Sequence, residues 1–215
     1  SCMYLNKKSI HHLDRIHRIN LMNSISGIKP ALLIGTKSKE NVPNLAIFSS
    51  IVHINSNPSL FGFFLRTTKN NRRDTYQNIM ENNVYTLNHV HTSIINNSHY
   101  TSLKFNANTS EFSSCNLTEQ YIDDFHAPFV EESKIKIGLK LKEVVKLKTS
   151  NSKLVVGEVE HIISNDKFYD ETYTLRLDHS DSICVGGLNS YYSLKKELSF
   201  PYISLKNINS IQDLL

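Results

Sequence analysis

The chain has 215 residues and a formal net charge of +4, with 40% hydrophobic and 20% charged residues. This length fits one domain with a sizeable core, and the lysines are spread along the chain instead of forming the basic block expected of a nucleic-acid-binding protein. Because the chain shows neither an apolar run long enough to span a membrane nor the pattern of a signal peptide, we expect a cytoplasmic protein without a membrane partner.

The N-terminal part of the chain is polar and rich in histidine, which indicates an irregular or helical lead-in. We assign residues 1–24 to this lead-in and residues 25–215 to a single domain. Three cysteines, Cys2, Cys115 and Cys184, lack the close pair spacing of a zinc site and leave one unpaired in any disulfide scheme. We therefore expect reduced, mainly structural cysteines.

The first strands are predicted from apolar runs bounded by turn residues. ALLIGT at 31–36 predicts a buried strand, and the turn KSKENVPN that follows indicates a hairpin with the next strand, which begins near Asn44. The stretch NLAIFSSIVHINSNPSLFGFFLR at 44–66 predicts two strands around a turn at Pro58, the second of them at 59–66.

The rest of the chain alternates between a few helices and further strands. Spacing of apolar residues predicts a helix from Asp74 to about Asn82, a strand at 84–90 and a helix within 92–105. KIKIGLKLKEVV at 134–145 alternates isoleucine or leucine with lysine, which is typical of a strand with its lysines in solvent. Residues 154–163 are its expected partner, and residues 172–178 are expected to add another strand.

This pattern predicts a mainly β protein with a few α helices, built as a closed or nearly closed antiparallel barrel. No G-x-G-x-x-G motif follows a strand, which excludes the usual dinucleotide-binding fold, so a cofactor must be held in another way.

Small and hydroxyl side chains stand where a buried strand would carry bulky ones. Asn44, Ala46, Ser49 and Ser50 leave room for a flat ligand close to the backbone. Arg66, Arg73 and Thr75 follow near the predicted start of a helix, where arginine and free N–H groups suit a phosphate. Together these residues predict a phosphorylated, planar cofactor.

Histidines supply the remaining candidates. His89 and His91 share one face of a strand, a spacing that a metal could use, but no third ligand at a telling distance accompanies them, so no metal site is predicted. His126 is equally compatible with a place near the cofactor and with an ordinary loop histidine.

Five segments, in order, resemble the flavin reductase-like proteins: NLAIFSSIVHINSNPSLFGFF, RRDTYQNI, YTLNHV, APFVEESKIKIGLKLKEVV and VGGLNSYYSL. The resemblance implies an FMN-binding split β-barrel, antiparallel and Greek-key-like, usually a homodimer with the flavin near the subunit interface. One departure is Ile47, which replaces the proline usual after Ala46. The residues that the resemblance assigns to the ring and ribityl chain are Asn44, Ala46, Ser49, Ser50 and Ile51, those for the phosphate are Arg66, Arg73 and Thr75, and those beside the flavin are Asn88, His89 and Tyr191.

The function implied is that of an oxidoreductase, an NAD(P)H-dependent flavin reductase that transfers a hydride to flavin N5. FMN is the expected flavin, with FAD as the alternative, and a small molecule or a protein accepts the electrons. No protein acid or base is required, because the flavin carries the chemistry. Two alternatives remain: a flavoprotein that retains FMN and acts on its own small substrate, and a flavin-binding protein without turnover.

Overall fold

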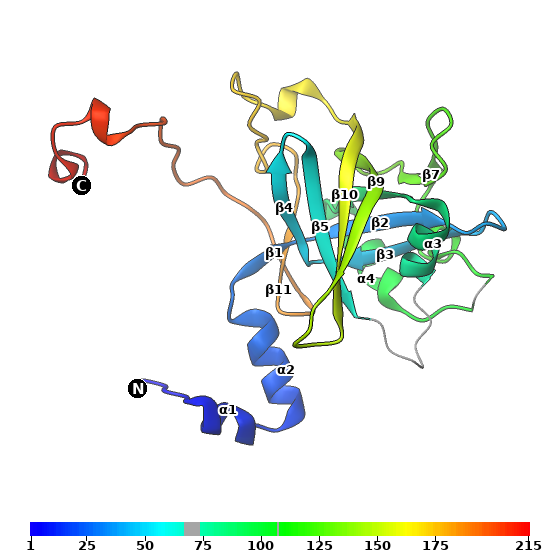
Figure 1. Cartoon of the computed structure of the whole chain (residues 1–215), viewed down its shortest axis with the longest axis horizontal. Coiled ribbons are helices and arrows are strands. Elements are labelled where there is room, and N and C mark those ends of the chain that lie inside the picture. The colour runs from blue at the N-terminus through cyan, green and yellow to red at the C-terminus, as the bar shows by residue number, and fades with distance from the viewer. Residues whose placement is uncertain (67–73, 107) are drawn as a thin grey trace.

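The computed structural model describes residues 1–66, 74–106 and 108–215 (Figure 1). Two helices, α1 (Lys7–His12) and α2 (Arg15–Ser24), precede the barrel. Each begins after a residue whose side chain accepts a backbone hydrogen bond, Asn6 from the N–H of Ser9 and Asp14 from the N–H of His17. The N-terminal segment is therefore helical.

The barrel is a seven-stranded antiparallel sheet with the order β3-β2-β6-β9-β10-β5-β4. Because β3 and β4 are the two edges, the barrel is open between them even though they follow one another in the chain. The barrel is therefore split, and it is not the fully closed barrel that was one of the two forms expected from the sequence. The strands are β2 (Leu32–Lys37), β3 (Pro43–Phe48), β4 (Ile51–Ser56), β5 (Ser59–Arg66), β6 (Val84–His89), β9 (Lys136–Lys146) and β10 (Ser152–Ile163).

The stretch at 44–66 forms three strands, where the sequence predicted two. The additional break lies at Ser49 and Ser50, between β3 and β4. The hydroxyl of Ser50 donates to the carbonyl of Phe64 at 2.7 Å and accepts from the N–H of the same residue at 3.1 Å. A side chain thus replaces backbone pairing at the corner where the chain leaves one edge of the sheet for the other.

The helix predicted from Asp74 is confirmed as α3 (Asp74–Asn82), but the one predicted within 92–105 is broken into three short turns. These are η1 (Thr92–Ile94), α4 (Ile95–His99) and η2 (Tyr100–Ser102), and α5 (Glu111–Ser114) follows them. A second small sheet joins β1 (Ile28–Pro30), β11 (Cys184–Gly186) and β12 (Ser190–Tyr192).

The lysine row of β9 does not lie wholly in solvent, which corrects the prediction for Lys136. Two short strands, β7 (Glu119–Gln120) and β8 (Phe129–Val130), belong to a segment that covers this end of β9. The Lys136 ammonium is buried and donates to the Gln120 side chain and to the carbonyl of Glu131. Desolvation lowers the pKa of Lys136, and these acceptors compensate for the lost water.

The strand expected at 172–178 is absent, and the prediction was wrong for a local reason. After η3 (Asp166–Phe168), the Asp170 carboxylate accepts hydrogen bonds from the N–H groups of Thr172 and Thr174, and Tyr173 has a positive φ of 64°. Such a turn cannot continue as a strand. Only one isolated bridge, between Tyr169 and Leu175, remains of the expected pairing.

The core lies on both faces of β2. Leu33 packs into one cluster with Val90, Phe112 and Ile183, whereas Ile34 packs into the barrel interior with Leu87 and Phe63, as alternation along a strand requires. None of the helices in the described ranges is long and apolar enough to span a membrane.

Candidate functional site

The edge strand β3 is the centre of the candidate site, and two distant side chains hold its outer edge. The N–H of Leu45 donates to the Glu111 carboxylate at 3.1 Å, and the N–H of Ile47 donates to the Thr101 hydroxyl at 3.0 Å. By the same alternation the next outward N–H is that of Ser49, and within the described ranges neither its N–H nor its hydroxyl has a partner. The edge is therefore closed at two positions and open at the third.

Glu111 and Thr101 were not identified from the sequence. They lie 66 and 54 positions from their partners, and no local pattern marks such a contact. Glu111 is buried, and desolvation raises the pKa of its carboxyl group, an effect opposed by the hydrogen bond from Leu45.

A buried polar cluster joins β3 and β2 to α3. The Asn44 side chain donates to the hydroxyl of Thr75 at 3.1 Å, and the Asn78 side chain donates to the hydroxyl of Thr36 at 3.0 Å. All four residues are buried. Strand β3 and the start of α3 are thus in direct contact. The sequence had related these two segments only through the types of residue that they carry.

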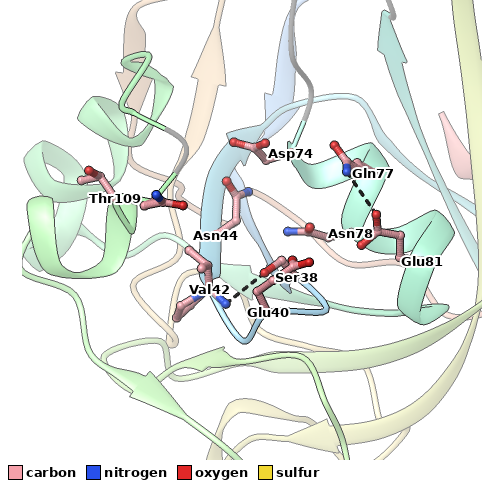
Figure 2. A pocket seen from close by; sticks show the side chains of 11 residues that line it. Ser38, Glu40, Val42, Asn44, Asp74, Gln77, Asn78, Glu81 and Thr109 are labelled. Atoms are coloured by element: carbon pink, nitrogen blue, oxygen red, sulfur yellow. Dashed lines mark hydrogen bonds between the residues drawn. The ribbon is translucent and has the colours of Figure 1, made fainter.

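A pocket of about 140 Å³ opens beside this cluster (Figure 2). Asn44 comes from β3, Asp74 and Glu81 come from α3, and Glu40 comes from the turn between β2 and β3. Three carboxylates disfavour a phosphate dianion at this position. Arg66, which is exposed at the end of β5, offers a cation that could hold a phosphate.

The remaining predicted residues of the opening stretch divide between two environments. Ala46 lies on β3 opposite Ile34, with Asn44 two positions before it on the same face. Ser50 uses its hydroxyl to anchor β5, and Ile51 turns into the barrel interior. Arg73 lies outside the described residues.

Asn88 is fully buried, and its side chain makes hydrogen bonds within the protein. Its amide nitrogen donates to the carbonyl of Leu33 and to the Thr86 hydroxyl, and its amide oxygen accepts from the N–H of Val130. These bonds tie β6 to β2 and β8, and a place beside a flavin stays a prediction for this residue.

His89 lies with Ile51 at a second cavity, of about 300 Å³, at one end of the barrel. Its Nδ1 is 2.8 Å from the Ser182 hydroxyl, and its ring stacks against His91. Burial, with a smaller contribution from His91, lowers the pKa of His89 to about 4, so this imidazole is neutral at pH 7. The structure therefore groups Ile51 and His89 apart from Asn44 and Thr75.

Tyr191 lies on the other face of β3. It packs against the same apolar cluster as Ile47, and its hydroxyl is 2.7 Å from Nδ1 of His99. The two rings meet edge to face at 5.6 Å, and burial raises the pKa of the Tyr191 hydroxyl. The tyrosine is thereby fixed in orientation near the edge strand.

Comparison with known proteins agrees with this arrangement. The family model of the flavin reductase like domain matches residues 27–178. A crystal structure from Shewanella frigidimarina, assigned as a flavin reductase with a split-barrel domain, is 36% identical, has a TM-score of 0.89, and the match covers 94% of this chain and 100% of that one.

Two more distant structures share the fold. Nitrilotriacetate monooxygenase component B from Bacillus cereus is 18% identical with a TM-score of 0.81, and the match covers 93% of this chain and 99% of that one. An FMN-binding protein from Thermus thermophilus is 13% identical with a TM-score of 0.67, over 94% and 98% of the two chains.

Proposed function

The chain belongs to the flavin reductase-like family, and on that premise we propose that it binds FMN non-covalently along β3 and at the first turn of α3, and that NAD(P)H reduces this flavin. The single observation that carries the proposal is the edge at Ser49, which no residue in the described ranges pairs, next to the outward N–H groups of Leu45 and Ile47, which are already paired.

The residues present fit a flavin. Ala46 projects only a methyl group, so a planar ring can approach the backbone. The N–H and the hydroxyl of Ser49, which have no partner among the residues that the structure describes, can donate to the polar edge of that ring. Thr75 accepts from Asn44, which leaves its own hydroxyl proton for an acceptor of the ligand. Arg66 supplies a cation at the end of β5 for the phosphate.

When bound, FMN would supply a ring that takes a hydride from a nicotinamide and passes electrons to an acceptor. The protein's part is to bind and orient. The hydrogen bonds to Glu111 and Thr101 hold the strand that faces the ring, and His99 holds Tyr191 on the neighbouring cluster. A donor on a strand held in this way, such as the N–H of Ser49, can stabilise a reduced, negatively charged flavin without having to reorganise.

We propose a homodimer as the working form, since both edges of the sheet, β3 and β4, need cover and the resemblance implies a flavin near a subunit interface. The electron acceptor is a small molecule or a protein.

The experiment is anaerobic addition of NADH or NADPH to the protein loaded with FMN. Loss of the visible flavin absorption, at a rate well above that of free FMN with the same nucleotide, supports a reductase. Flavin that binds and keeps its absorption with both nucleotides refutes NAD(P)H dependence and leaves a flavin-binding role.

A further inference from the structure

The cavity beside His89, at one end of the barrel, has the size and lining of a site for a small molecule. Its volume is about 300 Å³, and twelve of the described residues line it. Nine of these are aliphatic residues, proline or phenylalanine, none of them is charged, and the polar three are His53, His89 and Tyr169. An engineered apolar cavity of about 150 Å³ binds benzene, so this larger cavity accommodates a ring with small substituents.

The cavity runs from the surface into the core. At its rim Ile162 on β10 is 64% exposed, and His53 on β4 is exposed as well. Leu87 on β6 and Ile135, just before β9, also line it, and both are buried. A molecule from solvent can therefore reach apolar walls that belong to the core, which is the form of a ligand pocket and not of a sealed packing defect.

A chain of hydrogen bonds beside the cavity determines which ring nitrogen of His89 carries the proton. The Ser180 hydroxyl donates to the carbonyl of Leu177 at 3.2 Å, so it accepts in its 2.8 Å contact with the Ser182 hydroxyl. The Ser182 hydroxyl has thus used its proton, and it accepts from Nδ1 of His89 at 2.8 Å. Burial lowers the pKa of His89 to about 4, so the ring is neutral at pH 7 and has one N–H. Nε2 therefore holds a lone pair.

Nε2 of His89 is an acceptor that no described residue pairs. It is not sealed from solvent, and His89 lines this cavity, so Nε2 faces the cavity. The other polar lining residues have partners of their own: the Tyr169 hydroxyl donates to Ser164 at 3.0 Å, and Nε2 of His53 is 3.4 Å from the Ser56 hydroxyl. A water molecule at Nε2 of His89 finds one partner, whereas it needs two to four. A donor carried by an apolar molecule matches both the acceptor and the walls.

We propose that this cavity binds a small uncharged molecule that has an apolar ring and one hydrogen-bond donor, such as a phenol, and that Nε2 of His89 accepts from this donor. The uncharged lining disfavours nucleotides, phosphates and carboxylates, because burying an unpaired charge is costly. The inference goes beyond flavin reduction and does not rest on it, since the cavity shares no lining residue with the pocket beside Asn44.

The first test compares three ligands of similar size on the unaltered chain. Phenol has a donor, benzaldehyde has only an acceptor, and toluene has neither. NMR of isoleucine methyl groups locates the binding, because Ile51, Ile135, Ile137 and Ile162 line the cavity, whereas Ile94 packs on the other face of β2 and is the internal reference.

We expect phenol to shift the methyl signals of the four cavity residues and to saturate them with a Kd of about 1 mM or lower. Phenol should bind at least about 5-fold more tightly than benzaldehyde or toluene, which is the value of one hydrogen bond. Without that bond toluene is the favoured ligand, because it buries no polar group. Tighter binding of toluene or benzaldehyde, or signals that phenol leaves unchanged, would overturn the proposal.

The second test removes the acceptor. His89→Phe keeps a flat ring without nitrogen atoms, and His12→Phe, on the exposed helix α1, is the matched control. We expect His89→Phe to weaken phenol binding at least about 5-fold and to leave toluene binding unchanged, and His12→Phe to alter neither. Equal losses of both ligands in a folded His89→Phe protein would contradict a role for Nε2. Circular dichroism checks folding, and the ligand comparison on the unaltered chain decides the question if this variant does not fold.

The third test distinguishes the cavity from the flavin site. Phenol is titrated with and without saturating FMN, and we expect the same Kd in both titrations. A Kd that rises in proportion to the FMN concentration would assign the cavity to the flavin and refute the inference. A chain that binds phenol but no FMN would refute the proposed function and leave the inference standing.

Discussion

The Asn44 side chain donates a hydrogen bond to the hydroxyl of Thr75 at 3.1 Å, although 31 positions separate the two residues. Both are buried, and the bond joins the edge strand β3 to the first turn of α3. Two segments that we propose to hold opposite parts of one flavin are thereby fixed relative to each other.

Thr75 tests this joint. Thr75→Val keeps the shape but removes the hydroxyl, which leaves the buried Asn44 amide without its acceptor at a cost of about 1 to 3 kcal/mol in unfolding free energy. We expect FMN affinity to fall in the same variant. Thr75→Ser keeps a hydroxyl and is expected to retain most of the unfolding free energy and most of the FMN affinity. Denaturant unfolding and FMN titration measure these two quantities. Equal losses in the Val and Ser variants would show that the hydroxyl is not involved.

Arg66 tests the side from which the phosphate is held. Arg66→Ala should weaken FMN binding by about 1.5 kcal/mol, the lower end for a hydrogen bond to a charged group, because this side chain is exposed. Riboflavin, which has no phosphate, serves as the matched ligand. An equal loss of affinity for FMN and riboflavin would place Arg66 away from the phosphate.

Glu111 links the site to pH. Burial raises the carboxyl pKa of Glu111 above its ordinary 4.5, so the folded state holds the carboxyl proton more tightly than the unfolded state does. The contribution of Glu111 to stability therefore declines as pH rises from the pKa of the unfolded state to that of the folded state. Glu111→Gln keeps an acceptor for the N–H of Leu45 and removes the charge. We expect it to be more stable than wild type at pH 7, with the difference shrinking toward pH 4.

Glu111→Ala separates the charge from the hydrogen bond. It leaves the N–H of Leu45 without its acceptor and is expected to lower the unfolding free energy by about 1 to 3 kcal/mol at every pH. If the Ala and Gln variants have the same stability at pH 7, the bond to Leu45 contributes nothing.

His89 gives the opposite pH dependence. Its pKa is lowered to about 4 by burial, against an ordinary 6.5, so the unfolded state binds the proton first. The stability that neutral His89 provides is fully present above pH 6.5, declines as pH falls, and is lost by about pH 4. His91 stacks on this ring and also has a lowered pKa, so we expect His89→Gln to reduce the loss between pH 7 and pH 4.5 only in part. Denaturant unfolding of wild type and His89→Gln at pH 7 and pH 4.5 measures this loss of stability. An equal loss in the two proteins would show that His89 is not its source.

The sequence predicted those parts of the fold that depend on local patterns. Alternation identified β9 and β10, and capping chemistry with apolar spacing located α3. It placed Lys136 in solvent because alternation along one strand carries no information about a segment that later covers it. It missed the break at Ser49 and Ser50 because the hydroxyl of Ser50 pairs with a strand that follows 14 positions later.

The same limit applies to the site. Residue type alone selected Asn44 and Thr75, and the structure brings them into contact. The resemblance assigned Asn88 to the site as well, yet a polar side chain on a strand is as easily used for an internal hydrogen bond, and in this fold three such bonds occupy it. Glu111 and Thr101 act through long-range contacts with backbone N–H groups, which no sequence pattern encodes.

The most direct test of the central claim, that a flavin binds against β3 at Ser49, is an equilibrium titration of FMN by absorbance and fluorescence with wild type, Ser49→Ala and Ser49→Leu. The account predicts binding by wild type, a modest loss in Ser49→Ala, which keeps the N–H, and loss of binding in a folded Ser49→Leu, whose side chain fills the space for the ring. Undiminished FMN affinity in a folded Ser49→Leu protein would contradict it.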